Sequence, residues 1–339
     1  MPAQHPHHPS RRTLLTWLPA GAACVSVPAW AQQVGAGSEL PPPALSSYRF
    51  LVGFGAGGVP DAAARLIAAT MSERWKLPAM VENKTGVGDT LAARAVLAAP
   101  ADGSTLLSVS PAHATAPAVF RNPGYDTLRD FAPVTLIGDG PALIVVPKDL
   151  PAKNLAEMVA QAKARPGSLS YSSAGVGSSS HFAAALFCEQ AGIEGVNIPY
   201  KSVGEAMTET IAGRVQFHIA PYVSAAGMVK DGKVRALAVT SSKRIPEMPE
   251  LPTAAEARVP GYEWSFWYGL LASAKTPAPV VAQLNKDITG ILRLPQVRKQ
   301  LEAMGVTVAA STSADFQKLI EAEVTKYARI AKSANITPQ

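Results

Sequence analysis

The feature that most constrains the fold is a recurring order of strand, glycine-rich turn and helix. Residues 48–53 have a strand pattern and run into Gly55-Ala56-Gly57-Gly58, after which a helix is expected over about 61–74, with Pro60 beside its start. The same order recurs along the chain, which indicates an α/β architecture with parallel strands. Further strands are expected at 79–82, 105–109, 142–146, 169–172, 196–200, 215–220, 234–240 and 267–272, and further helices at 90–98, 154–164, 278–292, 296–304 and 314–332, with one more ending near 190.

Length and composition narrow the class of protein. The chain has 339 residues, enough for about two domains, and 47% of them are hydrophobic, so it can bury a core and is not disordered as a whole. The formal net charge is +6, but the basic residues are scattered singly and aromatic residues make up only 6%. This pattern argues against a nucleic-acid partner.

The first 31 residues have the pattern of a secretory signal peptide. An arginine pair precedes an apolar stretch over 14–30 that two prolines interrupt, and the stretch ends in Ala29-Trp30-Ala31, an A-x-A sequence. The arginine pair leaves ordinary and twin-arginine export both open, and Cys24 leaves a lipid anchor as an alternative. A linker rich in Gly, Pro and Ser is expected over 32–47. We therefore expect an exported protein that is soluble after cleavage.

Three loops share one design, in which a strand end is followed by glycine or hydroxyl residues and then by a helix start. They lie at 55–61, 83–90 and 174–180. A helix N-terminus exposes unpaired N–H groups and about half a positive charge, and glycine lets the main chain approach a ligand. The loops predict a shared anion pocket, although glycines that only turn the chain remain the alternative for any one loop. No P-loop sequence is present, and Lys84 is the one basic residue in these loops, so a small carboxylate fits better than a polyphosphate.

Catalytic and metal sites have weaker support. Ser178 or Ser179 with His181 would suggest an exported serine hydrolase, but G-x-S-x-G is missing and so close a spacing rarely builds a Ser–His pair. We expect His181 to pack or bond locally in the first turn of its helix. His113 and His218 are distant in sequence and no metal-ligand motif is present, so neither a metal nor a cofactor is predicted.

Several other side chains have structural interpretations. Asp61 either caps its own helix or recognises a ligand amine, and capping is favoured. Cys188, the one cysteine after the leader, lies mid-helix among apolar residues and is expected to be buried and inert. Trp264, Trp267 and Tyr268 are expected to pack in the core or between domains.

Together, the motifs resemble the Bug family of periplasmic solute-binding proteins, the receptors of tripartite tricarboxylate transporters. The resemblance covers nearly the whole chain after the linker, from about 48 to 331, and the ordered set is specific although no single motif is decisive. The motifs are Gly57-Gly58-Val59-Pro60-Asp61 with Ala64-Arg65, Val81-Glu82-Asn83-Lys84 with Gly86, Ala101-Asp102-Gly103 with Thr105-Leu106-Leu107, Asp130-Phe131-Ala132-Pro133-Val134, Ala174-Gly175-Val176-Gly177-Ser178 with His181, Pro199-Tyr200-Lys201, Gly232-Lys233-Val234-Arg235-Ala236-Leu237-Ala238-Val239-Thr240 and Pro252-Thr253-Ala254-Ala255-Glu256.

The resemblance implies a two-lobed Venus flytrap of the type II periplasmic-binding-protein fold, with mixed, mostly parallel sheets flanked by helices. It places lobe 1 at 48–142 and 268–339, and lobe 2 at 143–267. It further implies a periplasmic protein that holds a small carboxylate (a di-, tri- or aromatic carboxylate, or an amino acid) without a cofactor, and membrane transporter subunits or a sensor kinase as partners. The ligand contacts carried over are Phe54, Gly57, Gly58, Val59, Pro60, Asp61, Ser108, Ser110, His113, Gly175, Val176, Gly177, Ser178, Ser179 and Tyr222.

The chain departs from the family pattern at three places. Asp89 and Ser202 stand where the family often has glycine, and Gln216-Phe217-His218 lacks the Asp that family members commonly carry near the ligand. If Tyr222 lines the cleft instead, a ligand with an aromatic or uncharged end group fits. The leading hypothesis is a carboxylate receptor, and the alternatives are the exported serine hydrolase and a sensor subunit that never meets a permease.

Overall fold

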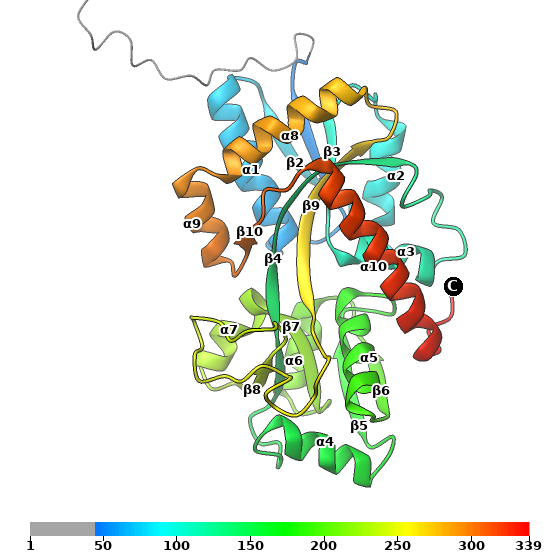
Figure 1. The fold of residues 1–339 in the computed structure, drawn as a ribbon, viewed down its shortest axis with the longest axis vertical. Helices are drawn as coiled ribbons and strands as arrows, with labels where there is room; N and C mark the ends of the chain where they lie inside the picture. Colours follow the sequence, from blue (N-terminus) through cyan, green and yellow to red (C-terminus); the bar gives the residue numbers. More distant parts are fainter. Residues whose placement is uncertain (1–44, 339) are drawn as a thin grey trace, which may run out of the picture. The chain divides into compact units, whose positions relative to one another are not determined.

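The computed structural model describes residues 45–338 (Figure 1). The predicted signal peptide and most of the predicted linker lie outside these residues. Within the described range, no helix combines the length and the apolar content needed to cross a bilayer.

The long strand β4 (Phe131–Pro147) divides the strands of the described residues into two sheets. Residues 131–141 of β4 pair in one sheet, which we call sheet A, and residues 142–147 pair in the other, sheet B. Sheet A also contains β1 (Tyr48–Val52), β2 (Ala79–Asn83), β3 (Thr105–Val109), β9 (Ser265–Ser273) and β10 (Thr307–Val308), and sheet B contains β5 (Leu169–Ser173), β6 (Gly195–Pro199), β7 (Phe217–Pro221) and β8 (Val234–Val239). The strand order is β2-β1-β3-β9-β4-β7-β5-β6, and β10 and β8 also pair with β4.

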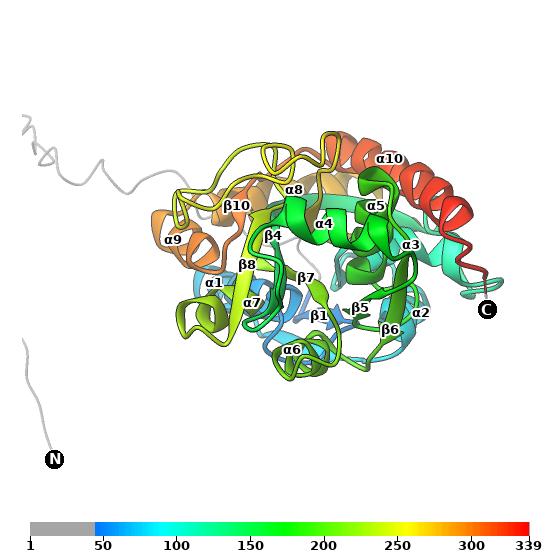
Figure 2. The same ribbon diagram turned by 90° about the horizontal axis from the view of Figure 1, so that it is seen from below.

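Strand directions place the carboxyl ends of the parallel strands at the boundary between the two sheets, which we call the seam. β4 runs from sheet A into sheet B, and β9 runs antiparallel to it. β3 is antiparallel to β9, and β1 and β2 run parallel to β3, so all three point toward sheet B. In sheet B, β7 is antiparallel to β4, and β5 and β6 run the same way as β7, so they point toward sheet A. The loops that follow β1, β2, β3 and β5 therefore face the seam (Figures 1 and 2).

Helices cover both sheets, and one of them joins the two. Those packed around sheet A are α1 (Val59–Trp75), α2 (Thr90–Ala98), α3 (Pro111–Val119), α8 (Ala278–Leu292) and α9 (Pro295–Ala303), and those around sheet B are α4 (Leu155–Ala164), α5 (Ser179–Ala191), α6 (Val203–Ile211) and α7 (Tyr222–Lys230). The last helix, α10 (Ser313–Ser333), packs on β4, on α3 and on α5. The ring of Tyr327 on α10 lies 5.4 Å from that of Phe182 on α5. This helix therefore ties the two sheets together on one side of the seam.

Most predicted elements are confirmed, with ends that shift by two residues or fewer. The exceptions are β4, which begins eleven residues before the predicted strand at 142–146, and elements that were not predicted: the helices α3, α6 and α7, the short 3-10 helix η2 (Val87–Asp89) and the two-residue strand β10. Helix α3 was missed because it contains two prolines. Pro111 occupies the first helical position, where its missing N–H costs nothing, and the carbonyl of His113 that Pro117 leaves unpaired faces the hydroxyl of Thr127 at 3.5 Å.

Helix α6 carries a start signal that the sequence analysis overlooked. Ser202 is its N-cap and accepts the N–H of Glu205 at 3.1 Å, while the Glu205 carboxylate accepts the N–H of Lys201 at 2.9 Å. This reciprocal pair is close to a capping box, which the spacing Ser-x-x-Glu predicts from sequence. Ser202, one of the departures from the family pattern, therefore acts as a helix cap.

The buried side chains form one main core and a smaller apolar cluster in sheet B. Trp264, Trp267 and Tyr268 are buried in the main core, which confirms their predicted packing role. Cys188 is also buried, as predicted, and burial raises the pKa of its thiol to about 12. The thiol therefore stays protonated and unreactive at neutral pH.

Gly140, on β4, lies where a side chain has no room. A Cβ atom at this position would come within 2.2 Å of the carbonyl oxygen of Gly305, just before β10, whereas one at Gly290 in α8 would meet nothing within 4 Å. We expect Gly140→Ala to lower the free energy of unfolding by about 1–3 kcal/mol, and the matched variant Gly290→Ala to raise it by about 0.5–1 kcal/mol. Urea unfolding followed by tryptophan fluorescence measures both. An unchanged midpoint for Gly140→Ala would show that the close approach to Gly305 does not constrain β4.

Candidate functional site

The first glycine loop connects β1 to α1 at the seam. Its residues 55–58 are exposed, and Gly57 has φ +87°, a backbone conformation that favours glycine. Gly58 is the N-cap of α1, and no side chain caps it. Within residues 45–338, the N–H groups of Gly58 and Val59 donate to no protein acceptor. Two donors at the positive end of the α1 dipole are therefore open to an anion.

Asp61 holds this loop from the third position of α1. Its buried carboxylate accepts the N–H of Gly57 at 3.0 Å, Nε of Arg65 at 3.0 Å and Nδ2 of Asn83 at 2.8 Å. Burial by itself raises the pKa of Asp61, but the hydrogen bonds from Arg65, Gly57 and Asn83 outweigh it and leave the pKa below its ordinary value. The carboxylate is therefore occupied by protein donors and does not act as an N-cap. The i,i+4 spacing of Asp61 and Arg65 was a signal for this pair that sequence reasoning missed.

The second glycine loop connects β5 to α5 on the other side of the seam. Ser178 is the N-cap of α5, and its Oγ accepts the N–H of His181 at 3.3 Å. Gly177 has φ +80° and donates its N–H to Nδ1 of His181 at 3.1 Å, which agrees with the local role predicted for this histidine. In the described part of the chain, the N–H groups of Ser179 and Ser180 donate to no protein acceptor. The α5 N-terminus therefore also presents open donors.

The two sheets touch at this second loop. Oγ1 of Thr115, on α3 beside sheet A, lies 2.9 Å from the carbonyl oxygen of Gly177 and 2.9 Å from that of Ala112 in its own helix, so its one proton is shared between these two acceptors. The side chain of Val119 fills the space beside the glycine, because a Cβ atom there would lie 2.4 Å from Cγ1 of Val119. Together with the strand directions, this contact places both glycine loops at the same seam. Thr115 had no sequence signal, because its partner lies 62 residues away.

Ser108, near the end of β3, and Ser110, which follows the strand, hold the helices beside the site. Ser108 donates its hydroxyl to the carbonyl oxygen of Pro60 at 3.0 Å, and Ser110 caps α3 by accepting the N–H of Ala112 at 3.4 Å. Both side chains are buried. Their hydrogen bonds to the protein main chain position α1 and α3, so these hydroxyls are committed to protein partners.

His113, one of the expected ligand contacts, packs among side chains of the protein. It is fully buried, its ring stacks on Tyr125 with 5.8 Å between centroids, and its Nδ1 lies 3.4 Å from the carboxylate of Asp89. Phe131 packs edge-on against the same ring at 5.0 Å. Asp89, another departure from the family pattern, is thus buried beside His113.

The remaining predicted contacts lie near the loops. Tyr222 begins α7 directly after β7, is half-buried, and packs its ring against Gly305. The carbonyl of Phe54 accepts Nδ2 of Asn83 at 3.0 Å, so the loop after β2 supports the first glycine loop. Val176 is 36% exposed and forms the tip of the second loop. These three residues are therefore placed at or beside the seam.

The serines of the second loop do not form a nucleophile with His181. Oγ of Ser178 lies 3.2 Å from Oγ of Ser180 and caps α5, while Nδ1 of His181 is used by Gly177. A nucleophilic serine needs a hydrogen bond to the base, and neither serine has one to this imidazole. The described residues also contain no cluster of three His, Cys, Asp or Glu side chains that could hold a metal ion.

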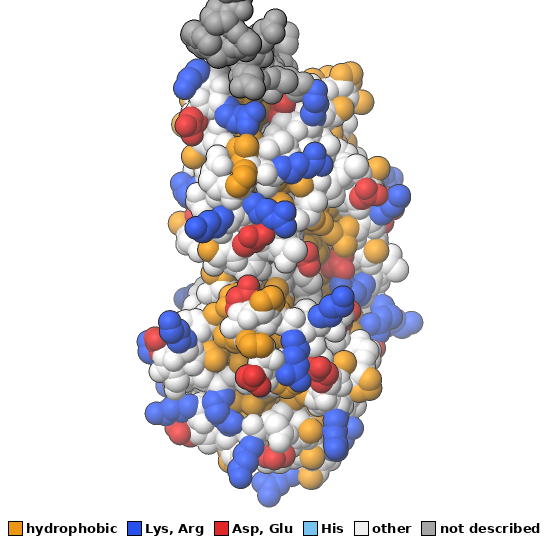
Figure 3. All heavy atoms as spheres, turned by 60° about the vertical axis from the view of Figure 1, so that its left-hand side comes forward, with side chains coloured by type: hydrophobic (Ala, Val, Ile, Leu, Met, Phe, Trp, Pro, Cys, Tyr) orange, Lys and Arg blue, Asp and Glu red, His pale blue; other side chains and the backbone are white. Residues whose placement is uncertain are grey.

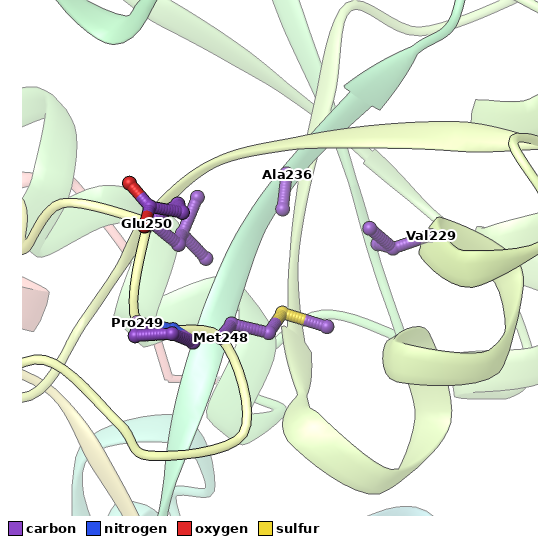
Figure 4. Close-up of a pocket in the computed structure, with 6 residues that line it drawn as sticks. Val229, Ala236, Met248, Pro249 and Glu250 are labelled. Atoms are coloured by element: carbon purple, nitrogen blue, oxygen red, sulfur yellow. The ribbon is translucent and has the colours of Figure 1, made fainter.

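Other surface features lie away from the glycine loops. A largely apolar hollow of about 350 Å³ is lined by Val229, Ala236, Met248 and their neighbours between α7, β8 and the following loop (Figure 4). A second hollow of about 530 Å³ lies between α4 and residues 252–258. On the face shown in Figure 3, Lys and Arg side chains are spread singly with acidic side chains between them. This face has no continuous basic surface of the kind that binds nucleic acid.

Residues 63–336 match the model of the tripartite tricarboxylate transporter family receptor. The chain belongs to this family. The family consists of solute-binding receptors and not of enzymes, so the hydrolase alternative is rejected.

Solved structures of similar proteins share the fold. A protein of R. palustris, solved with adipate, is 34% identical, with a TM-score of 0.80 over 86% of this chain and 98% of that one. The periplasmic binding protein BugD is 31% identical, with a TM-score of 0.77 over 86% and 99%. MatC from Rhodopseudomonas palustris, solved with malate, is 32% identical, with a TM-score of 0.76 over 84% and 98%. These likenesses confirm the predicted periplasmic-binding-protein α/β fold of this receptor.

Two buried histidines are expected to make the receptor less stable in acid. Burial lowers the pKa of both His181 and His218 from 6.5 to about 4. Between pH 6.5 and pH 4 these histidines bind protons in the unfolded chain but not in the folded chain. Their full contribution to the free energy of unfolding is therefore present above about pH 6.5. It falls as the pH drops toward 4, by up to about 3 kcal/mol per histidine. We expect His218→Gln to remove one such contribution, measured by urea unfolding at about pH 6.5, 5.5 and 4.5. A variant with the same pH dependence as the wild type would contradict this assignment.

Proposed function

We propose that this receptor is a periplasmic protein that binds a small dicarboxylate between the two glycine loops and delivers it to membrane transporter subunits or to a sensor. The observation that carries the proposal is the pair of open helix N-termini, one beside each sheet, that face the same seam. Family membership supports the receptor role, and the periplasmic location of BugD supports the proposed compartment. No cofactor or metal takes part in this proposal.

A ligand with two carboxylates suits two N-termini. The open N–H groups of Gly58 and Val59 would bind one carboxylate, and those of Ser179 and Ser180 the other, each at the positive end of a helix dipole. Adipate and malate, present in two of the similar structures, both carry two carboxylates. The cationic side chain of Arg65, on α1, is already paired with Asp61 at 2.9 Å. A highly charged polyphosphate would therefore find little compensating charge.

A ligand that contacts both sheets would favour the arrangement in which they are closest. Ligand-driven closure requires contacts that exist only in the closed state, and a dicarboxylate shared by the two loops supplies them. We propose lobes at 48–142 with 268–339, and at 143–267. The transfer of β4 from sheet A to sheet B between Pro141 and Ala142 supports the first boundary.

Thermal unfolding with candidate ligands tests the proposal. Adipate or malate at about 100 times its dissociation constant is expected to stabilise the purified protein by about 2.7 kcal/mol. Gly58→Val is expected to abolish this shift, because Gly58 has φ −72° and its nearest atoms at 3.7 Å leave room for the fold but place a side chain where the ligand would bind. Gly290→Ala, away from the loops, serves as the control that keeps the shift. If none of a panel of mono-, di-, tri- and aromatic carboxylates raised the midpoint, the proposed function would be wrong.

A further inference from the structure

In both glycine loops, the side chain of the third helical residue accepts a hydrogen bond from the N–H of the residue before the N-cap. In α1, the third helical residue, Asp61, accepts the N–H of Gly57 at 3.0 Å. In α5, the third helical residue, His181, accepts the N–H of Gly177 at 3.1 Å. In an ordinary capping box the side chain at this position accepts from the N-cap residue itself. Both loops bind the residue one position earlier, as the carboxylates of Glu157 in α4 and Glu205 in α6 also do. The first helical N–H groups, of Val59 in α1 and of Ser179 and Ser180 in α5, donate to no protein acceptor in the described residues.

The Gly177 residue is held on both sides. Its N–H donates to Nδ1 of His181, and its carbonyl oxygen lies 2.9 Å from Oγ1 of Thr115, whose proton it shares with the carbonyl oxygen of Ala112. Its φ of +80° and the side chain of Val119 exclude any larger residue. The orientation of the chain entering α5 is therefore set by these contacts, and with it the direction of the Ser179 and Ser180 N–H groups.

We propose that His181 is a positioning residue of the ligand site, which holds Gly177 through the lone pair on Nδ1 so that the first N–H groups of α5 face the seam. Asp61 has the same role in the first loop. The inference rests on the proposed function for the ligand but requires of residue 181 only an acceptor atom at the δ position. Asn offers its Oδ1 at that position, and Leu offers a methyl group that cannot accept.

The surroundings of His181 keep this lone pair available. The ring is 6% exposed, with Tyr171 of β5 at 6.2 Å and Phe182 at 6.0 Å between ring centroids. Burial lowers the pKa of His181 to about 4, and burial also raises the pKa of the Tyr171 phenol. Both groups are therefore neutral at neutral pH, and Nδ1 of the imidazole can accept the Gly177 N–H.

The test compares His181→Leu with His181→Asn. Amide hydrogen exchange at Gly177, followed by NMR without ligand, reports the hydrogen bond directly. Calorimetric titration with adipate and with malate reports ligand affinity. We expect His181→Leu to lose the protection of Gly177 and to bind at least about tenfold more weakly, and His181→Asn to restore both to within about threefold of the wild type. His218→Leu, which removes another buried histidine of sheet B, is the matched control and should lower stability without changing the affinity of the folded protein.

The outcomes separate the two proposals. A protected Gly177 amide in His181→Leu, or an Asn variant as weak as the Leu variant, would overturn the positioning role. A wild type that binds neither acid would overturn the proposed ligand class, while amide hydrogen exchange at Gly177 would still decide the role of His181.

If His181→Leu does not fold, the wild type and His181→Asn are compared at several pH values. The ligand affinity of the wild type relative to His181→Asn should fall as the pH approaches 4, because only the wild type loses its acceptor by protonation. A constant ratio would contradict the proposal.

Discussion

The direction of β4 is the constraint on which the rest of the structure depends. One strand of 17 residues enters both sheets, so the direction of every strand in sheets A and B is fixed relative to it. The pairings then bring the carboxyl ends of β1, β2, β3 and of β5, β6 and β7 to one seam. Because a helix follows each glycine turn, the positive ends of α1 and α5 point at the same boundary.

The electrostatic potential at the two glycine loops is set by the main-chain dipoles of α1 and α5 more than by charged side chains. Asp61 is paired with Arg65, so the first loop gains no net charge from them. His181 is neutral because burial lowers its pKa to about 4, so the second loop gains none either. In the proposed site, the open N–H groups of the two helices are then the main attraction for an anion.

Local signals explain how much of this could be predicted. The helices α2 and α8 begin and end at the predicted residues. Their ends could be predicted because the turns and prolines that set them lie within a few residues in the sequence. Helix α3 was missed because prolines usually indicate the end of a helix, and this helix contains two of them. The burial of His113 against Asp89 depends on how α3 packs, and no spacing in the sequence shows it.

By itself, the sequence determined the α/β order, the family, and which helices begin at glycine-rich loops, because turn and helix-start preferences act over a few neighbouring residues. Only the tertiary structure decided that Asp61 and His181 each occupy a glycine N–H, and that Thr115 reaches Gly177 from the other sheet. The physical reason is that those bonds depend on distance and direction in space. Such geometry is set by strand pairing between segments that lie far apart along the chain.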